Sequence, residues 1–293
     1  MAVVEASLVD AAFAKINLTL RVLGRRADGY HELESLVVFA DVADSLTLVP
    51  DETLTLDVFG PFASASGKID DNLVLKAFDA LQQRVEGLKV GRFTLDKKLP
   101  VAAGIGGGSA DAAAALRLIA RLNGIAIGDT RLAAAALATG ADVPVCLEGK
   151  ARIMRGVGEK LSPPLRLPPL PAVLVNPGVP LGTKDVFGKF TLVPGAKLAS
   201  DDVPAEFDAL IHYLERNGND LTDAAIACVP EIATVLDALS AQRGARLARM
   251  SGSGATCFAL FDTSEAAAAA ANVLETAHRG WWVAATAFAA AHS

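Results

Sequence analysis

The chain has 293 residues, more than a single hydrophobic core usually serves, so two domains are expected. Hydrophobic residues make up 52% of the sequence and charged residues 20%, which excludes an intrinsically disordered chain. The 27 basic and 33 acidic residues give a net charge of −6, which argues against nucleic acid or an anionic membrane as the main partner.

The first predicted element is a strand over residues 12–22, where apolar residues alternate with polar ones. Lys15 and Asn17 share its polar face and lie roughly 6 to 7 Å apart at the rise of a strand. A lysine on a strand is usually an ordinary solvated side chain, and this alternative stays open for Lys15. A basic turn over residues 24–29 follows and leads into Tyr30 and His31. Alone, that pair fits a packed tyrosine beside a surface histidine as well as it fits a binding site.

Several further elements precede the middle of the chain. Strands are predicted over residues 36–42, 45–49, 53–59 and 92–95, separated by Asp, Gly and Pro. Asp71 and Asn72 are expected to cap a helix whose apolar residues recur at helical spacing.

A glycine-rich stretch over residues 100–111 precedes an alanine-rich helix. Its four glycines allow backbone N–H groups to approach a ligand closely, and Ser109 is the expected N-cap of a helix over residues 112–122. The N-terminus of such a helix attracts anions, so a phosphate site is predicted. The spacing fits neither the P-loop nor the dinucleotide fingerprint. A flexible loop that caps the helix is the alternative.

A second alanine-rich helix is predicted from Asp129 to Gly140. Asp142 then lies between Gly140 and Pro144, in a turn whose backbone fixes the direction of the carboxylate. The alternative is that Asp142 is an N-cap or a turn residue, which is the commoner role of such an aspartate.

Residues 161–171 contain five prolines and read as a connection between domains, which predicts domains over residues 1–160 and 161–293. A strand is expected at 173–175, and Thr183 is the expected cap of a short helix that contains Phe187. Helices at 205–214, 220–227, from Pro230 and from Ser264 alternate with strands at 246–250, 256–261 and 281–286. The predicted class is α+β.

The cysteines and the first residues of the chain indicate the cellular compartment of the protein. Cys146, Cys228 and Cys257 are far apart, with no Cys-x-x-Cys pair, so reduced thiols are expected. Glu5 and Asp10 stand where a secretory signal needs basic and apolar residues, and no segment reaches about 18 apolar residues. A cytoplasmic protein, or the mature form of an imported one, is expected, with no membrane partner.

Six separated segments together resemble the GHMP small-molecule kinases, in order and in spacing. They are Ala-Lys-Ile-Asn-Leu at 14–18, Asp-Gly-Tyr-His at 28–31, the glycine stretch at 100–113, Gly-Ala-Asp-Val-Pro at 140–144, Asn-Pro-Gly at 176–178 and Ser-Gly-Ser-Gly at 251–254. The resemblance covers nearly the whole chain. It implies a two-domain fold with the glycine loop and helix as the ATP site of the N-terminal domain, and a smaller α+β C-terminal domain. The Lys-x-Asn and Asp-Gly-Tyr-His segments resemble the branch that phosphorylates the 2-hydroxyl of a cytidine-diphosphate-linked methylerythritol, in non-mevalonate isoprenoid synthesis.

The resemblance also implies roles for single residues, with ATP and Mg²⁺ as cofactors. Lys15 and Asp142 match the catalytic pair, with Asp142 accepting the proton of the substrate hydroxyl. The nucleotide site falls on Asn72 and on the loop residues Pro100, Val101, Ala102, Ala103, Gly104, Ile105, Gly106, Gly107, Gly108, Ser109 and Ala110. The substrate site falls on Asn17, Tyr30, His31, Thr183, Phe187, Gly252 and Gly254, with the cytosine stacked on Tyr30, Phe187 as a second wall and His31 at its polar edge. No residue is assigned to the metal.

The sequence departs from the family pattern at three positions: Ala110 replaces a second loop serine, Val38 a glutamine, and Thr222 an acid. Two alternatives stay open, a GHMP kinase for homoserine or mevalonate and a catalytically silent ligand sensor on the same fold. The retained Lys15, Ser109 and Asp142 argue against the sensor. The expected partner is a small cytidyl diphosphate compound, with no nucleic acid, and the chain is expected to be a monomer or a weak homodimer.

Overall fold

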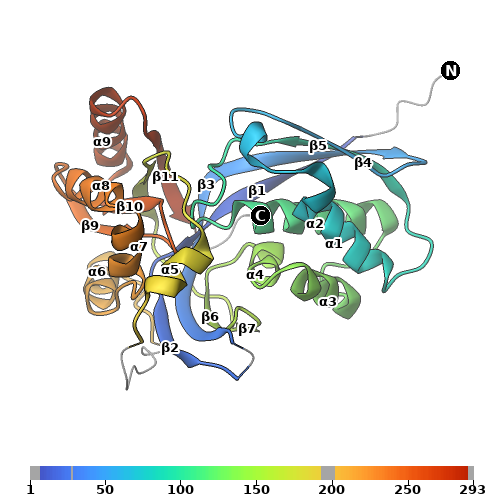
Figure 1. The fold of residues 1–293 in the computed structure, drawn as a ribbon, viewed down its shortest axis with the longest axis horizontal. Coiled ribbons are helices and arrows are strands. Elements are labelled where there is room, and N and C mark those ends of the chain that lie inside the picture. Colours follow the sequence, from blue (N-terminus) through green and yellow to red (C-terminus); the bar gives the residue numbers. More distant parts are fainter. Residues whose placement is uncertain (1–6, 28, 193–201, 290–293) are drawn as a thin grey trace. The chain divides into compact units, whose positions relative to one another are not determined.

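The structure is a computed structural model that describes residues 7–27, 29–192 and 202–289 (Figure 1). The chain forms two compact units, each built from separate stretches of sequence. The first unit contains Met1–Ala14, Ala43–Val101 and Gly106–Glu148, and the second contains Lys15–Val42, Ala102–Ile105 and Gly149–Ser293. The long strand β3 (His31–Asp51) contributes residues to both units.

Strands and four helices build the first unit. Strand β5 (Val90–Asp96) pairs antiparallel with the second half of β3 and parallel with β4 (Thr55–Phe59), while β1 (Leu8–Asn17) contributes its residues before Lys15. The short 3-10 helices are η1 (Ala63–Ala65) and η2 (Ile69–Asp71). The helices α1 (Leu73–Gln82), α2 (Gly107–Asn123), α3 (Thr130–Thr139) and α4 (Val143–Glu148) pack on one another. Buried alanines over residues 112–115 let α2 approach its neighbours closely.

The second unit is a sheet covered by helices. Its strands follow the order β3, β11 (Trp282–Ala289), β8 (Leu170–Asn176), β10 (Cys257–Phe261) and β9 (Ala245–Met250), and the neighbours from β11 to β9 are antiparallel. The first half of β3 also pairs with β2 (Arg21–Arg25) and β6 (Arg152–Gly156), and β6 with β7 (Lys160–Leu161). Helix α9 (Ser264–Ala277) packs on β11 and β8, and α8 (Glu231–Ser240) on β9 and β10. The other helices are α5 (Thr183–Lys189), α6 (Phe207–Arg216) and α7 (Thr222–Cys228).

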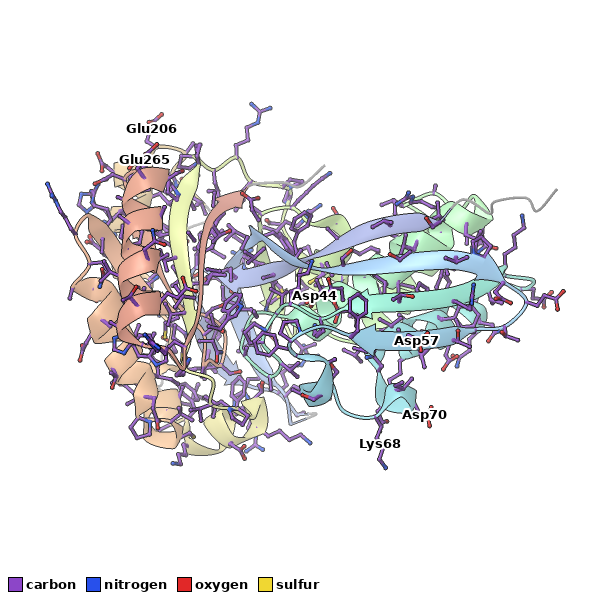
Figure 2. The ribbon with its side chains drawn as sticks, turned by 90° about the horizontal axis from the view of Figure 1, so that it is seen from above. Asp44, Asp57, Lys68, Asp70, Glu206 and Glu265 are labelled. Carbon is purple, nitrogen blue, oxygen red and sulfur yellow. The ribbon has the colours of Figure 1, made fainter. Side chains whose placement is uncertain are left out.

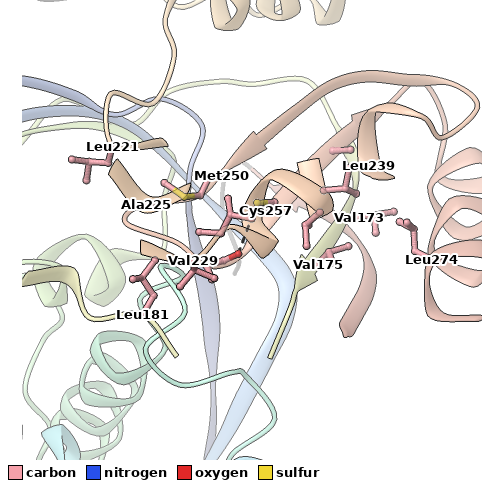
Figure 3. Packing of buried hydrophobic residues seen from close by; sticks show 14 of the residues in the cluster. Val173, Val175, Leu181, Leu221, Ala225, Val229, Leu239, Met250, Cys257 and Leu274 are labelled. Atoms are coloured by element: carbon pink, nitrogen blue, oxygen red, sulfur yellow. Dashed lines mark hydrogen bonds between the residues drawn. The ribbon is translucent and has the colours of Figure 1, made fainter. Parts of the chain in front are cut away.

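A single hydrophobic cluster fills the space between this sheet and its helices (Figure 3). Val173 and Val175 of β8 and Cys257 of β10 lie against side chains such as Leu239 of α8 and Leu274 of α9, all fully or almost fully buried. Burial of each large side chain stabilises the fold by about 1.5 to 3 kcal/mol. The cluster therefore holds β9 and β10 rigidly, and with them the turn that joins these two strands.

Most predicted elements are confirmed, and so is the α+β class. The Asn72 side chain caps α1 by accepting the N–H of Val74, and Asp129 caps α3 by accepting the N–H of Arg131. Gly124, with a φ of 65°, ends α2 as expected. Residues 162–169 form no helix or strand. The division into domains 1–160 and 161–293 stays a prediction.

The strand predictions at the start of the chain are wrong in two respects. The single strand over residues 12–22 is two strands, since β1 ends at Asn17 and β2 begins at Arg21, and its polar face is not solvated because Lys15 is only 4% exposed. The strands at 36–42 and 45–49 are one strand, β3. Asp44 does not interrupt it, because its side chain is buried and paired with Lys97.

The predicted caps of two helices are also wrong. Helix α2 begins at Gly107 after Gly106 in a left-handed conformation, so Ser109 lies inside the first turn and makes no cap. Helix α5 begins at Thr183 with Gly182 at the N-cap. In both cases a glycine provides the bend that leads into the helix, which leaves the hydroxyl one to three residues later free of the capping role.

The three cysteines are free thiols in the described structure, with Cys146 and Cys257 buried. No helix within residues 7–27, 29–192 and 202–289 is both long enough and apolar enough to cross a membrane.

Candidate active site

The first half of the glycine loop, Ala102–Ile105, is attached to two other segments of the second unit. The N–H of Lys15 donates to the carbonyl of Ile105 at 2.9 Å, and the N–H of Thr256 to the carbonyl of Ala103 at 3.1 Å. The Ser251 hydroxyl donates to the carbonyl of Gly104 at 3.0 Å. The loop thus lies directly between the end of β1 and the turn that precedes β10.

Two glycines make this close approach possible. Gly104 has a φ of +74°, and a Cβ there would lie 2.4 Å from the carbonyl oxygen of Ser251 and 2.7 Å from the nitrogen of Gly254. Gly252 has a φ of +58°, and its Cβ would lie 2.7 Å from the carbonyl oxygen of Gly104. Both the backbone conformation and the space exclude a side chain at these positions.

The second half of the loop starts helix α2 in the first unit. The first turn of a helix leaves N–H groups without an intrahelical acceptor, here those of Gly107, Gly108 and Ser109, at the positive end of the helix dipole. A Cβ on Gly108 would lie 3.4 Å from Cδ1 of Leu73, the first residue of α1. The predicted nucleotide residue Asn72 therefore caps a helix that starts beside the start of α2. Such a pair of N-termini is suited to bind an anion.

Asn17 is 1% exposed and lies at the end of β1. Its N–H donates to the Ser251 hydroxyl at 3.1 Å, and its Nδ2 donates to the Ser35 hydroxyl at 2.7 Å. Its Oδ1 has no hydrogen-bond partner among the residues the structure describes and would lie 3.2 Å from a Cβ on Gly252. Because buried acceptors are normally satisfied, this oxygen is a candidate acceptor for a substrate hydroxyl.

The two predicted catalytic residues lie in different units. Lys15 belongs to the second unit and is buried, and Asp142 belongs to the first unit, where its side chain is half-buried. The carbonyl of Asp142 accepts the N–H of Cys146 at 3.2 Å, so the residue lies directly before α4 and its backbone is bonded to the first turn of that helix. The pairing of Lys15 with Asp142 stays a prediction.

An aromatic pair lies at the predicted cytosine site. The rings of His31 and Phe187 stack with centroids 4.5 Å apart and planes inclined by 17°, and Phe190 meets His31 edge-on at 6.4 Å. Tyr30 is 66% exposed, so one of its faces is available for stacking. Burial and then the charge of Arg25 lower the pKa of His31, which keeps its ring neutral near pH 7. Asp28, which begins this motif, lies outside the described residues.

Asn219, which the sequence did not assign to the site, and the predicted substrate residue Thr183 both contact the Ser-Gly-Ser-Gly turn. Asn219 Nδ2 donates to the carbonyl oxygens of Met250 and Gly252, at 2.9 and 2.8 Å. Its Oδ1 accepts the N–H of Leu221 at 3.0 Å. The Thr183 and Ser253 hydroxyls lie 3.0 Å apart, which connects α5 to the same turn. The sequence predicted only a helix at 220–227 in this region, because the turn that Asn219 contacts lies about 30 residues further along the chain.

Comparisons with known proteins agree with this geometry. The profile of the GHMP kinases N terminal domain matches residues 72–150, and that of the GHMP kinases C terminal domain matches residues 201–279. A 4-diphosphocytidyl-2-C-methyl-D-erythritol kinase of Rhodopseudomonas palustris is 58% identical over 287 residues, which cover 94% of this chain and 96% of the relative. The kinase of the same name from Methylorubrum extorquens is 56% identical over 282 residues, 94% of this chain and 97% of that one. This chain belongs to the 4-diphosphocytidyl-2-C-methyl-D-erythritol kinase family of the GHMP kinases.

Solved structures place this family member on the same fold. A crystal structure of 4-(cytidine 5'-diphospho)-2C-methyl-D-erythritol kinase aligns with a TM-score of 0.76 and 33% identity, covering 96% of this chain and all of that one (100%). A homoserine kinase from Cytophaga hutchinsonii aligns with a TM-score of 0.72 at 18% identity, covering 99% and 97% of the two chains. At that identity the second likeness shows the fold alone.

Membership of the family makes the chain an ATP-dependent small-molecule kinase. ATP is the phosphoryl donor that the family implies. Within the described part of the chain, no group of three or more His, Cys, Asp or Glu side chains is arranged to hold a metal ion.

Proposed function

We propose that this chain transfers the γ-phosphoryl group of ATP to the 2-hydroxyl of 4-diphosphocytidyl-2-C-methyl-D-erythritol, a step of non-mevalonate isoprenoid synthesis. The observation that carries the proposal is the 58% identity to a kinase of that name along nearly the whole chain. The motif residues Lys15, Asn17, Tyr30 and His31 support it, because a kinase for homoserine or mevalonate has no cytosine to bind.

On the nucleotide side, the triphosphate binds to residues 100–110 and to the first-turn N–H groups of α2. Phosphoryl transfer passes through a loose transition state, so the protein mainly positions the reactants and offsets negative charge. Mg²⁺ in kinases is held largely by the phosphates of the nucleotide and needs few protein ligands.

On the substrate side, Asp142 accepts the proton of the attacking hydroxyl. Its backbone carbonyl accepts the N–H of Cys146 of α4, and in a loose transition state position matters more than basicity. Lys15 offsets the negative charge that builds up on the transferred group.

The cytosine stacks on Tyr30, with Phe187 as the second wall and His31 at the polar edge of the base. The contact between the rings of His31 and Phe187 supports their assignment to one pocket. The neutral imidazole of His31 can donate a proton from one nitrogen and accept at the other. Asn17, Thr183, Gly252 and Gly254 bind the remainder of the substrate, and the buried Oδ1 of Asn17 is available to accept a hydroxyl proton.

The test is ATP-dependent phosphorylation of three alcohols: 4-diphosphocytidyl-2-C-methyl-D-erythritol, homoserine and mevalonate. We expect the cytidyl compound to have the highest kcat/KM, by about 10³-fold or more, because the other two leave the polar groups of the pocket unpaired. Phosphorus NMR of the product identifies the phosphorylated hydroxyl. A faster reaction with homoserine or mevalonate contradicts the proposed substrate, and no turnover of any compound supports the silent sensor.

A further inference from the structure

Three buried charged side chains meet at the start of helix α2, within the first unit. Lys97 directly follows β5, Asp44 lies on β3, and Asp111 lies on α2; each is at most 3% exposed. The Lys97 ammonium donates to Asp111 Oδ2 at 2.6 Å and also to Asp44. In Figure 2, Asp44 lies in the interior, whereas Lys68 and Asp70 of the same unit project outward. None of the three takes part in the proposed chemistry.

Burial of this cluster has a large cost in desolvation free energy. Taking three charges out of water costs several kcal/mol per ion, and a buried ion pair is often no more stabilising than apolar side chains of the same size. One ammonium also cannot neutralise two carboxylates. Burial, together with the neighbouring Asp44 and against the opposing effect of Lys97, raises the pKa of Asp111 to about 7. A role beyond stability would account for this arrangement.

The cluster contacts the residues directly before the glycine loop and the helix that follows it, both of which belong to the first unit. Before the loop, Asp44 Oδ1 accepts the N–H of Lys98 at 2.5 Å and the N–H of Leu99 at 2.8 Å, which fixes the backbone directly ahead of Pro100. After the loop, Asp111 lies on the second turn of α2 and is bonded to Lys97.

The start of α2 lies directly against the same ammonium. A Cβ on Gly107, the first residue of α2, would lie 3.3 Å from the Lys97 Nζ and 3.9 Å from Asp44 Oδ2. A side chain at this position would require the ammonium to shift by a few tenths of an ångström. The ammonium is thus the common contact of strand β3, the end of β5 and the first two turns of α2.

We propose that Lys97, together with Asp44 and Asp111, is a positioning group that holds the two ends of the glycine loop, so that the first-turn N–H groups of α2 are preorganised to bind the phosphates of ATP. This rests on the proposed role of the loop in ATP binding. A preorganised loop binds its ligand more tightly, because less conformational entropy is lost on binding. Without the ammonium, the loop and the start of α2 can move independently. Binding of ATP is then weakened, whereas binding of the second substrate is not.

The test compares Lys97→Met and Asp111→Asn with the wild type. Direct titration with Mg-ATP by calorimetry gives the Kd without the second substrate, and steady-state kinetics give both KM values. We expect Lys97→Met to raise the Kd and KM for ATP by about tenfold or more, and Asp111→Asn by about threefold or more. The KM for the cytidyl substrate is expected to stay within about twofold.

Asp10→Asn is the matched control. Asp10 forms an ion pair, at 3.0 Å, with Arg117, which lies further along helix α2 than Asp111. This variant also removes one carboxylate charge beside α2, and we expect its Kd for ATP to stay within about twofold of the wild-type value.

Three results would overturn the inference. One is a folded Lys97→Met variant that binds ATP like the wild type; another is a proportional rise of both KM values, which indicates a general packing defect. Where Lys97→Met does not fold, Asp111→Asn decides, because it keeps the size of the side chain: unchanged ATP affinity in that variant also refutes the role. A wild type that binds ATP but does not phosphorylate the cytidyl compound contradicts the proposed function and leaves this test intact.

Discussion

Ser251 illustrates how single side chains organise the second unit. Its hydroxyl accepts the N–H of Asn17 and donates to the carbonyl of Gly104, so one oxygen connects the end of β1 to the glycine loop. The sequence identified all three residues through the family motifs but did not indicate that they touch. Hydrogen bonds between residues 234 positions apart follow from the fold and leave no local pattern in the sequence.

Asp142→Asn tests the proposed general base. Asparagine keeps the shape of the side chain but cannot accept the substrate proton as a carboxylate does, so kcat is expected to fall by roughly 10²-fold or more. Binding of ATP does not depend on this group, and its Kd is expected to change by less than about twofold. The measurements are steady-state kcat and calorimetric titration with ATP. Turnover close to that of the wild type would exclude Asp142 from the reaction.

Tyr30→Ala tests the proposed stacking of the cytosine. Stacking of a base on an aromatic ring contributes about 1 to 3 kcal/mol, so the KM for the cytidyl substrate is expected to rise by roughly 5- to 150-fold. The KM for ATP is expected to stay the same. Val273→Ala is the control. It removes an apolar side chain that lies on α9 and, at 55% exposed, is comparable in exposure to Tyr30. Equal weakening of both substrates would indicate damage to the fold in place of a lost base contact.

At the scale of elements, residues 102–105 of the glycine loop and the turn over residues 251–254 form one assembly within the second unit. Strands β9 and β10, which this turn joins, are held by the hydrophobic cluster beneath the sheet. The sequence predicted the loop, the turn and both strands. It did not predict that backbone packs on backbone here, because glycine spacing alone does not distinguish a flexible loop from a crowded one.

Gly104→Ala tests this packing. The new Cβ would lie 2.4 Å from the carbonyl oxygen of Ser251, and the residue has a φ of +74°, so we expect a loss of about 2 kcal/mol or more in the free energy of unfolding. The control is Gly128→Ala, where nothing lies within 4 Å of the new Cβ and no positive φ is required. Urea unfolding of the two variants gives the comparison. Equal stability of the two would mean that the loop is not packed as described.

At the scale of the whole molecule, both units bury charged side chains. The first unit buries the ion cluster of Lys97, Asp44 and Asp111, and the second unit buries Glu34, which forms an ion pair with Arg155. Apolar burial does not depend on pH, but a buried carboxyl with a shifted pKa does. Comparing the wild type with Asp111→Asn isolates the contribution of this one carboxyl.

The pKa of Asp111 is raised from 3.8 to about 7 in the folded protein. Between these values the folded state binds more protons than the unfolded state, so the stability that this group contributes is present at low pH and falls as pH rises toward 7. The free energy of unfolding of the wild type, relative to that of Asp111→Asn, is thus expected to decline between about pH 5 and about pH 8. Urea unfolding of both proteins at about pH 5 and about pH 8 measures this difference in the free energy of unfolding. A difference that is constant, or that grows with pH, would contradict the raised pKa.

The sequence alone determined the α+β class, most helices and strands, and the kinase family, because these follow from local periodicity, turn residues and ordered motifs. It did not predict α4, β6 or β7. Capping by Asn72 and Asp129 was predictable for the same reason, since each cap bonds to an N–H two residues away. Only the tertiary structure decided that Lys15 is buried, that Asp44 lies inside one continuous strand, and that Ser109 does not cap α2. Each of these depends on partners distant in sequence or on a left-handed glycine at the helix start, and alternation of polar and apolar residues carries no information about either.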